Sequence, residues 1–292
     1  MPTINATSLQ LPDEKVRYWV LIKEVPIIMF GRQKIATMTA EFLGTGILTL
    51  VFLSVQRSTI GIPYFIALAA GAALAVASYF FGDVSGSHLN PAITLALWTA
   101  RKIGTLTSVC YIIVQLLGAW AAYGVYHYFV TTSLQPIGGK YNAHILFAEA
   151  IGTLVLGLAW GAVYFKKYDA TNRAILLGGS YALAIIIAAA AGIGIANPAV
   201  ALGVRAWSIN GAMGWGTYAL GPVLGALIGV NLYALLFAPD SYSVLASETI
   251  VVSETIVQAK TTGRSSSRAA VRKMPTKKVV AKKATTSSKR KS

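Results

Sequence analysis

Two copies of the tripeptide Asn-Pro-Ala are the residues of this sequence whose types and spacing suit a specific task. Asn90-Pro91-Ala92 and Asn197-Pro198-Ala199 lie 107 residues apart, and each opens a short run that is compatible with a helix. Asn is a favoured N-cap and Pro is favoured at the first helical position, so each copy predicts the start of a short helix. An N-capping Asn spends its side-chain oxygen on backbone N–H groups, which leaves its amide NH2 free to donate outward.

The tripeptides belong to a longer internal repeat, which makes them a much stronger signal than a single Asn-Pro turn. The segment around Glu41 (AEFLGT) recurs around Glu149 (AEAIGT), and Gly118-Ala119 recurs as Gly225-Ala226. Each half holds three long apolar segments, and an odd number of spans gives the second half the opposite orientation in a membrane. The two short helices are then expected to enter from opposite faces and to meet near the midplane.

The composition is that of a membrane protein. Hydrophobic residues make up 55% of the chain and charged residues only 12%, whereas soluble domains have about 25% charged residues. Six stretches approach the ~20 apolar residues that cross a bilayer. They lie near 36–56, 62–82, 107–130, 143–165, 174–191 and 217–238. A soluble protein is disfavoured, because six long uncharged runs would be hard to cover.

The predicted fold class is therefore an all-α membrane protein. It has six transmembrane helices plus two re-entrant half-helices, arranged as an inverted 3+3 repeat. The membrane domain covers 36–238, with repeats at about 36–130 and 143–238. Residues 1–35 form an N-terminal segment that lacks the apolar core of a cleavable signal peptide.

Lys and Arg predict the orientation of the chain. If both termini are cytoplasmic, the outer side holds only Arg57, Lys140 and Arg205 of the basic residues before the tail. This excess of Lys and Arg on the cytoplasmic side indicates an integral, multi-pass membrane protein with both termini in the cytoplasm. The sequence does not identify the membrane.

Residues 239–292 differ from the rest of the chain. From Lys260 onward they are mostly Lys, Arg, Ser, Thr and Ala, and they supply most of the net charge of +15. Such a composition buries no core and predicts a disordered cytoplasmic tail. Contact with anionic lipids of the inner leaflet is favoured over binding of nucleic acid, which similar basic tails also perform.

No constellation of catalytic residues accompanies these features. Glu41 and Glu149 stand symmetrically at the heads of the two halves, and carboxylates inside a span usually face the protein interior. A paired carboxylate without a substrate pocket does not make an enzyme. The three histidines show no metal-ligand spacing, so we expect a non-enzyme with no metal and no cofactor.

The motifs AEFLGT, SGSHLNPAITLA, QLLGAW, AEAIGT, ANPAVALG and GPVLGALIG, in this order, resemble the aquaporin, or major intrinsic protein, family. The resemblance implies a passive channel with one pore in each subunit of a homotetramer. Asn90 and Asn197 would donate to a passing water oxygen, and Glu41 and Glu149 would be structural acceptors for the re-entrant loops. Gly86 and His88 would belong to the pore-lining loop.

One position departs from the common family pattern. Most aquaporins have Arg directly after the second tripeptide, and here that residue is Val200. Ungapped comparison assigns the other outer constriction positions to Ala70, Ile185 and Gly194. This small, apolar set implies a wider outer constriction without charged donors.

Three functions stay open from the sequence. The first is a water channel with some permeability to small neutral solutes. The second is a facilitator mainly for glycerol, urea or ammonia. The third is an interaction protein that acts through its basic tail.

Overall fold

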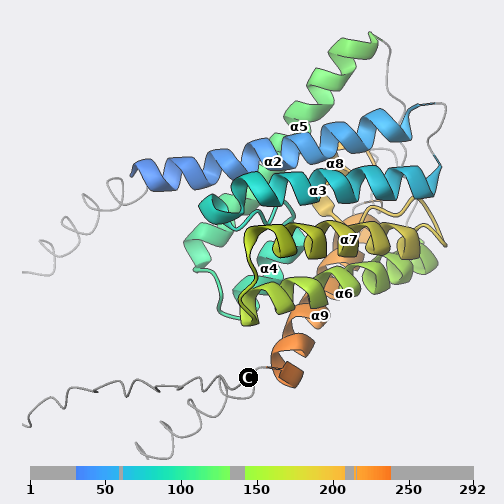
Figure 1. Ribbon diagram of the computed structural model, residues 1–292. Coiled ribbons are helices and arrows are strands. Elements are labelled where there is room, and N and C mark those ends of the chain that lie inside the picture. The colour runs from blue at the N-terminus through green and yellow to red at the C-terminus, as the bar shows by residue number, and fades with distance from the viewer. Residues whose placement is uncertain (1–30, 59–61, 132–141, 208–213, 215, 238–292) are drawn as a thin grey trace, which may run out of the picture. The chain divides into compact units, whose positions relative to one another are not determined.

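The computed structural model describes residues 31–58, 62–131, 142–207, 214 and 216–237 (Figure 1). The basic tail and most of the N-terminal segment lie outside the described residues, so the expectations about them stay predictions. Six long helices are apolar enough to cross a membrane. They are α2 (Arg32–Gln56), α3 (Pro63–Ser85), α5 (Thr105–Val130), α6 (Ala143–Phe165), α7 (Ala170–Ala188) and the continuous pair η1 (Gly216–Leu220) and α9 (Gly221–Phe237). The six predicted spans are thus confirmed.

Helix α7 begins four residues before the predicted fifth span, and polar capping explains the difference. The Asp169 side chain accepts a hydrogen bond from the backbone N–H of Asn172 at 3.0 Å and a second one from its side-chain amide. An N-cap of this kind satisfies a backbone donor that hydropathy does not register. The same hydrogen bonds lower the pKa of the exposed Asp169 carboxyl below its ordinary value.

The last span opens with a π-helical turn, η1, before α9. Pro222 follows immediately, and proline has no N–H and crowds the carbonyl one turn earlier. A widened turn gives the ring that room.

The two predicted half-helices are present, as α4 (Pro91–Thr99) and α8 (Pro198–Gly203). Each starts at the Pro of its tripeptide, with Asn90 or Asn197 as the extended N-cap residue. Both lie between the long helices, α4 against α9 and α5, and α8 against α5 and α2 (Figure 1).

Close helix contacts follow the repeat. Helices α3 and α7 run side by side (Figure 1), and a Cβ on Gly71 would lie 2.6 Å from the carbonyl oxygen of Gly178. A Cβ on Gly178 would lie 2.5 Å from the carbonyl oxygen of Gly71. These two glycines are repeat counterparts, 107 residues apart, so the two halves meet here across a local pseudo-two-fold axis. Small residues are what allow helix backbones to approach this closely in a membrane.

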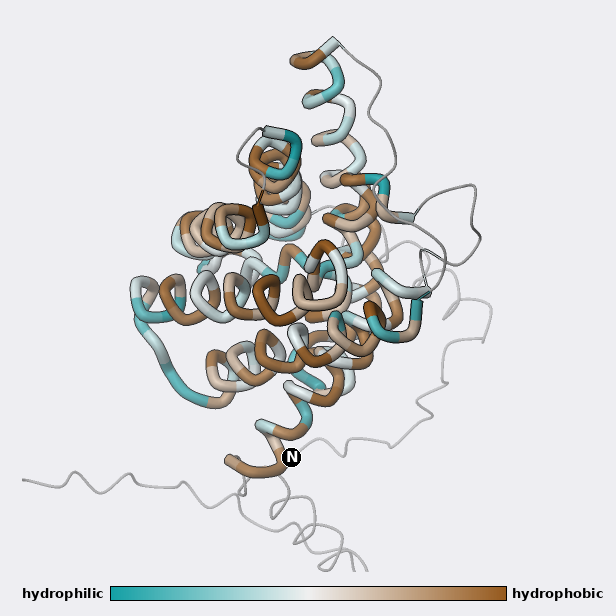
Figure 2. Tube along the Cα trace, turned by 90° about the vertical axis from the view of Figure 1, so that its right-hand side faces the viewer, coloured by the Kyte–Doolittle hydropathy of each residue, from teal (hydrophilic) through white to brown (hydrophobic). Residues whose placement is uncertain are grey.

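The outward faces of the long helices are apolar. Leu68, Phe80, Trp120, Ile175 and Leu235 are all more than half exposed, and hydrophobic residues run along the length of the helices in Figure 2. Exposed apolar side chains of this number suit a lipid environment and would be a liability in water.

Candidate functional site: the meeting point of the two half-helices

The side-chain oxygens of the two asparagines cap the half-helices as the sequence predicts. Asn90 Oδ1 accepts a hydrogen bond from the N–H of Ala92 at 2.9 Å. Asn197 Oδ1 accepts from Ala199 at 3.0 Å and from Val200 at 3.4 Å. Both side chains are almost fully buried. The caps fix the direction of each amide group.

The amide groups differ from the expectation, because they are not wholly free. Asn90 Nδ2 donates to the carbonyl oxygen of Ala196 at 2.9 Å, and Asn197 Nδ2 donates to that of Leu89 at 2.8 Å. Each bond crosses to the residue just before the other asparagine. Since an Asn amide carries two N–H donors, one remains on each side chain. Reasoning about a local cap misses these bonds, because the acceptor comes from the opposite half.

Glu41 holds the loop before the first half-helix. Its carboxylate accepts from the backbone N–H of His88 at 2.9 Å and of Leu89 at 2.8 Å. It also accepts from the Ser85 hydroxyl at 2.7 Å and from Gln115 Nε2 at 2.8 Å. Four donors around one fully buried carboxylate compensate for its removal from water.

Glu149 holds the second loop in the corresponding way. It accepts from the backbone N–H of Ile195 at 2.8 Å and of Ala196 at 2.7 Å. These residues are the repeat counterparts of His88 and Leu89. Both carboxylates therefore bind backbone N–H groups of the loops. They are not arranged as an acid–base pair around a substrate. Among the residues that the structure describes, Glu149 has two donors where Glu41 has four.

A narrow space lies where the two half-helices meet, and we call it the central cavity. It encloses about 170 Å³ but leaves almost no volume for the centre of a water molecule. Both asparagines line it, together with other side chains from both halves of the repeat. The lining residues are Leu48, Leu74, His88, Asn90, Leu156, Trp160, Tyr181 and Asn197.

His88 lines the central cavity, and its neighbour Tyr164 lines a second, wider cavity. The Nε2 of His88 lies 2.7 Å from the Tyr164 hydroxyl and its Nδ1 lies 3.2 Å from Thr94 Oγ1. Gly86, two residues earlier, has a φ of 88°, and a Cβ there would lie 2.9 Å from the Tyr164 hydroxyl. Only glycine takes this conformation without strain, so the loop and Tyr164 can approach each other closely.

The wider cavity opens at the side of the bundle where α6 ends and α7 begins. It measures about 560 Å³ and its lining includes Gly82, Tyr164, Lys166 and Arg173. Arg173 pairs with Asp83 at 2.9 Å, which fixes the end of α3 against the start of α7. We call this cavity the polar vestibule; Tyr164, which lines it, contacts His88 of the central cavity.

The four residues assigned to the outer constriction are all buried. Ala70, Ile185 and Val200 are fully buried and belong to one hydrophobic cluster. Gly194 has a φ of 70°, and a Cβ there would lie 2.3 Å from the carbonyl oxygen of Ile185. None of the four is among the residues that line the central cavity. The guanidinium carbon of Arg205 lies 5.8 Å from the centre of the Tyr123 ring on α5.

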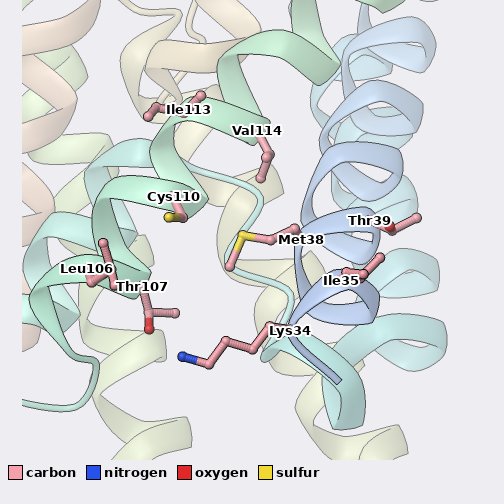
Figure 3. A pocket seen from close by; sticks show the side chains of 9 residues that line it. All are labelled: Lys34, Ile35, Met38, Thr39, Leu106, Thr107, Cys110, Ile113 and Val114. Atoms are coloured by element: carbon pink, nitrogen blue, oxygen red, sulfur yellow. The ribbon is translucent and has the colours of Figure 1, made fainter. Parts of the chain in front are cut away.

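A second groove lies between α2 and α5, away from the half-helices. Figure 3 shows its lining, with Lys34 at one end and the only cysteine of the chain, Cys110, among apolar side chains. It is larger than the central cavity, since it leaves about 300 Å³ for the centres of water-sized molecules and the central cavity leaves almost none. Neither asparagine contributes to it, so it is separate from the candidate site.

Sequence reasoning missed two large side chains of the central cavity, Trp160 and Tyr181. Both sit in continuous apolar runs, where periodicity does not show which face is turned inward. The repeat carried a usable signal, because Tyr181 is the counterpart of Leu74 and Trp160 is the counterpart of Phe52. A substitution within the repeat near the tripeptides marks a place where the two halves differ.

Comparisons with known proteins agree with this arrangement. The family model described as Major intrinsic protein matches residues 31–233. Aquaporin-4 of Mus musculus is 33% identical over 184 residues, which cover 60% of this chain and 57% of that protein. The glycerol uptake facilitator protein-like 6 of Lactiplantibacillus plantarum is 33% identical over 217 residues, 69% of this chain and 98% of that protein. The X-ray structure of the aquaglyceroporin from Plasmodium falciparum matches with a TM-score of 0.59 at 24% identity, over 70% of this chain and 97% of that one, and has the same fold.

Proposed function

The chain belongs to the major intrinsic protein family, and on that premise we propose that it is a passive channel for water that also admits small neutral solutes. Membership and six apolar helices make it an integral, multi-pass membrane protein of a channel family. The observation that carries the proposal is the central cavity, where Asn90 and Asn197 cap two half-helices that meet head to head.

The two asparagines orient the passing molecule. Each has one amide N–H left after the bond to the opposite loop, and both line the same narrow space. A water molecule that accepts from both points its own hydrogens away from the centre. The half-helix N-termini add positive potential at this point. Protons are therefore not relayed through the centre, and cations are repelled.

The proposed outer constriction adds no charge to this selection. Val200 stands where most family members have Arg, and Ala70, Ile185 and Gly194 bring no donor side chain. Exclusion of cations then rests on the half-helices. The absence of a guanidinium from this position favours passage of ammonia beside water.

A facilitator mainly for larger neutral solutes is the second candidate. The apolar set around Val200 favours it, and two of the similar proteins are named a glycerol uptake facilitator and an aquaglyceroporin. We place the water channel first and this facilitator second, because the central cavity is too narrow to favour a polyol over water.

Three further features are part of the proposal. The protein is a homotetramer with one pore per subunit, as the family resemblance implies. Both termini are cytoplasmic, which puts the polar vestibule beside Arg173 on the inner side. The basic tail contacts anionic lipid head groups and takes no part in conduction.

The test is osmotic shrinkage and solute uptake of proteoliposomes measured by stopped flow. A sucrose gradient reports water, and ammonia, urea and glycerol are tried in turn. We expect shrinkage faster than in protein-free liposomes and entry of at least ammonia. Val200→Arg should lower ammonia flux more than water flux, because it adds a bulky cation at the outer constriction. A water rate equal to that of protein-free liposomes, with folded protein present, would refute the proposal.

A further inference from the structure

The lining of the central cavity is symmetric except at three positions, one of which is His88, whose counterpart Ile195 does not line the cavity. Leu48 and Leu156 are repeat counterparts, as are Asn90 and Asn197, and each pair matches in type. The remaining pair is Leu74 on α3 and Tyr181 on α7.

Trp160, from α6, lines the cavity as well, while its counterpart Phe52 does not. The second half thus contributes two large aromatic side chains, Trp160 and Tyr181, whereas the first half contributes the smaller ring of His88.

Tyr181 is held in place by a hydrogen bond. Its hydroxyl donates to the carbonyl oxygen of Ile195 at 2.9 Å, and the side chain is fully buried. The N–H of Ile195 is bound by Glu149, so the acceptor belongs to a fixed part of the loop. Moving the ring aside would break this bond, which contributes about 1 kcal/mol. The bond therefore favours a ring position at the wall of the central cavity.

Trp160 is packed in a comparable way. Its ring centre lies 5.4 Å from that of His88, nearly perpendicular, and 6.0 Å from that of Tyr164. The side chain is fully buried, and its Nε1 has no hydrogen-bond partner among the residues that the structure describes. A buried N–H without a partner is costly, and a molecule in the cavity that accepts from it removes this cost. The orphaned donor supports a position of Trp160 on the path.

The two cavities differ sharply in width. The vestibule holds about 560 Å³, whereas the central cavity has almost no volume for the centre of a water molecule. His88, Trp160 and Tyr181 all line the central cavity, and none of them lines the vestibule. The outer constriction residues stand elsewhere, since none of them lines the central cavity.

We propose that Trp160 and Tyr181 form a central size filter, which limits this channel to neutral molecules about as wide as water. Water and ammonia pass, and urea and glycerol are rejected at the centre even though the outer constriction carries no charged wall. The filter rests on the proposed channel function and specifies its solute class.

The experiment compares water and glycerol fluxes in proteoliposomes of wild type, Tyr181→Leu and the double variant Trp160→Leu/Tyr181→Leu. Tyr181→Leu copies the residue of the first half, Leu74. Trp120→Leu is the matched control, because Trp120 is 66% exposed on the outer face of α5. Monodisperse elution in detergent and retained water flux show that each variant is folded.

Wild type and Trp120→Leu should conduct water and take up glycerol no faster than protein-free liposomes. Tyr181→Leu and the double variant should take up glycerol about tenfold faster or more, which corresponds to a barrier lower by about 1.4 kcal/mol.

Rapid glycerol entry into wild-type liposomes would overturn the filter without any variant. So would a double variant that conducts water and still rejects glycerol. Wild type that conducts no water at all would instead refute the channel proposal, so the two failures are distinguishable.

Discussion

Asn90 and Asn197 each use one side-chain amide for two purposes. One N–H ties the loop of the opposite half through the carbonyl of Ala196 or Leu89, and the other stays at the central cavity. The structural role is therefore linked to the proposed pore role at each residue. A change that removes the N–H donors affects the fold of the loops as well as the passing molecule.

Asn197→Asp tests this link. A carboxylate only accepts hydrogen bonds, so it would face the Leu89 carbonyl oxygen without a proton between them. Leaving that buried carbonyl unsatisfied costs about 1–3 kcal/mol, and we expect a lower unfolding temperature and a loss of water flux. Asn231→Asp is the control, since Asn231 lies on α9 outside the central cavity. Unchanged stability and flux in Asn197→Asp would contradict the role assigned to the amide.

The two buried carboxylates predict unequal effects. Gln keeps one acceptor oxygen of Glu and replaces the other with a donor group. Glu41→Gln leaves two of four donors without an acceptor, whereas Glu149→Gln leaves one of two. At about 1–3 kcal/mol for each buried unsatisfied group, Glu41→Gln should lower the thermal unfolding midpoint more than Glu149→Gln.

Asp169→Asn serves as the control for these substitutions, because Asp169 is exposed and an amide oxygen still caps α7. We expect a small change there. An equal or reversed order of the two glutamates would show that the loop hydrogen bonds do not set the stability.

At the scale of elements, hydropathy predicts where the helices lie in the sequence but does not predict which faces of them contact one another. The long helices α3, α5 and α6 begin within two residues of their predicted starts, since apolar runs of this length have one stable placement in a bilayer. The starts of α4 and α8 were also predictable, because Asn followed by Pro is a local signal. The crossing hydrogen bonds and the filter residues were not, since they depend on which faces of distant segments meet.

The contact between α3 and α7 predicts a steric effect at Gly178. A Cβ there would lie 2.5 Å from the carbonyl oxygen of Gly71 and 2.6 Å from Ala75 Cβ. Gly178→Leu should push the two helices apart and cost about 1–3 kcal/mol or more, seen as a lower yield of monodisperse protein. Gly179→Ala is the control on the same helix, because the described residues leave open space around it. A fully stable Gly178→Leu variant would show that this close approach is not needed.

At the scale of the whole molecule, the channel fold and the basic tail are separable in the sequence. The family match ends at residue 233 and α9 ends at Phe237, whereas the dense basic run begins near Lys260. Both repeats are complete before the tail starts. The tail is therefore expected to mediate contacts with anionic lipid and to take no part in forming the pore.

Truncation after residue 245 tests this separation. The shortened protein should elute as the same oligomer as the full chain and conduct water at the same rate per protein. Its binding to liposomes with anionic lipid is expected to be weaker, because twelve basic residues are removed with the tail. Loss of the oligomer or of water flux would show that the tail is part of the channel.

The most direct measurement of the central claim is the simultaneous water and proton flux of one preparation of wild-type proteoliposomes. Light scattering reports water after an osmotic jump, and a trapped pH-sensitive dye reports protons after a pH jump. On the proposal that Asn90 and Asn197 orient each water molecule between two half-helix N-termini, we expect rapid water flux and a proton leak no larger than that of protein-free liposomes. Rapid proton entry together with water, or no water flux from folded protein, would contradict this account.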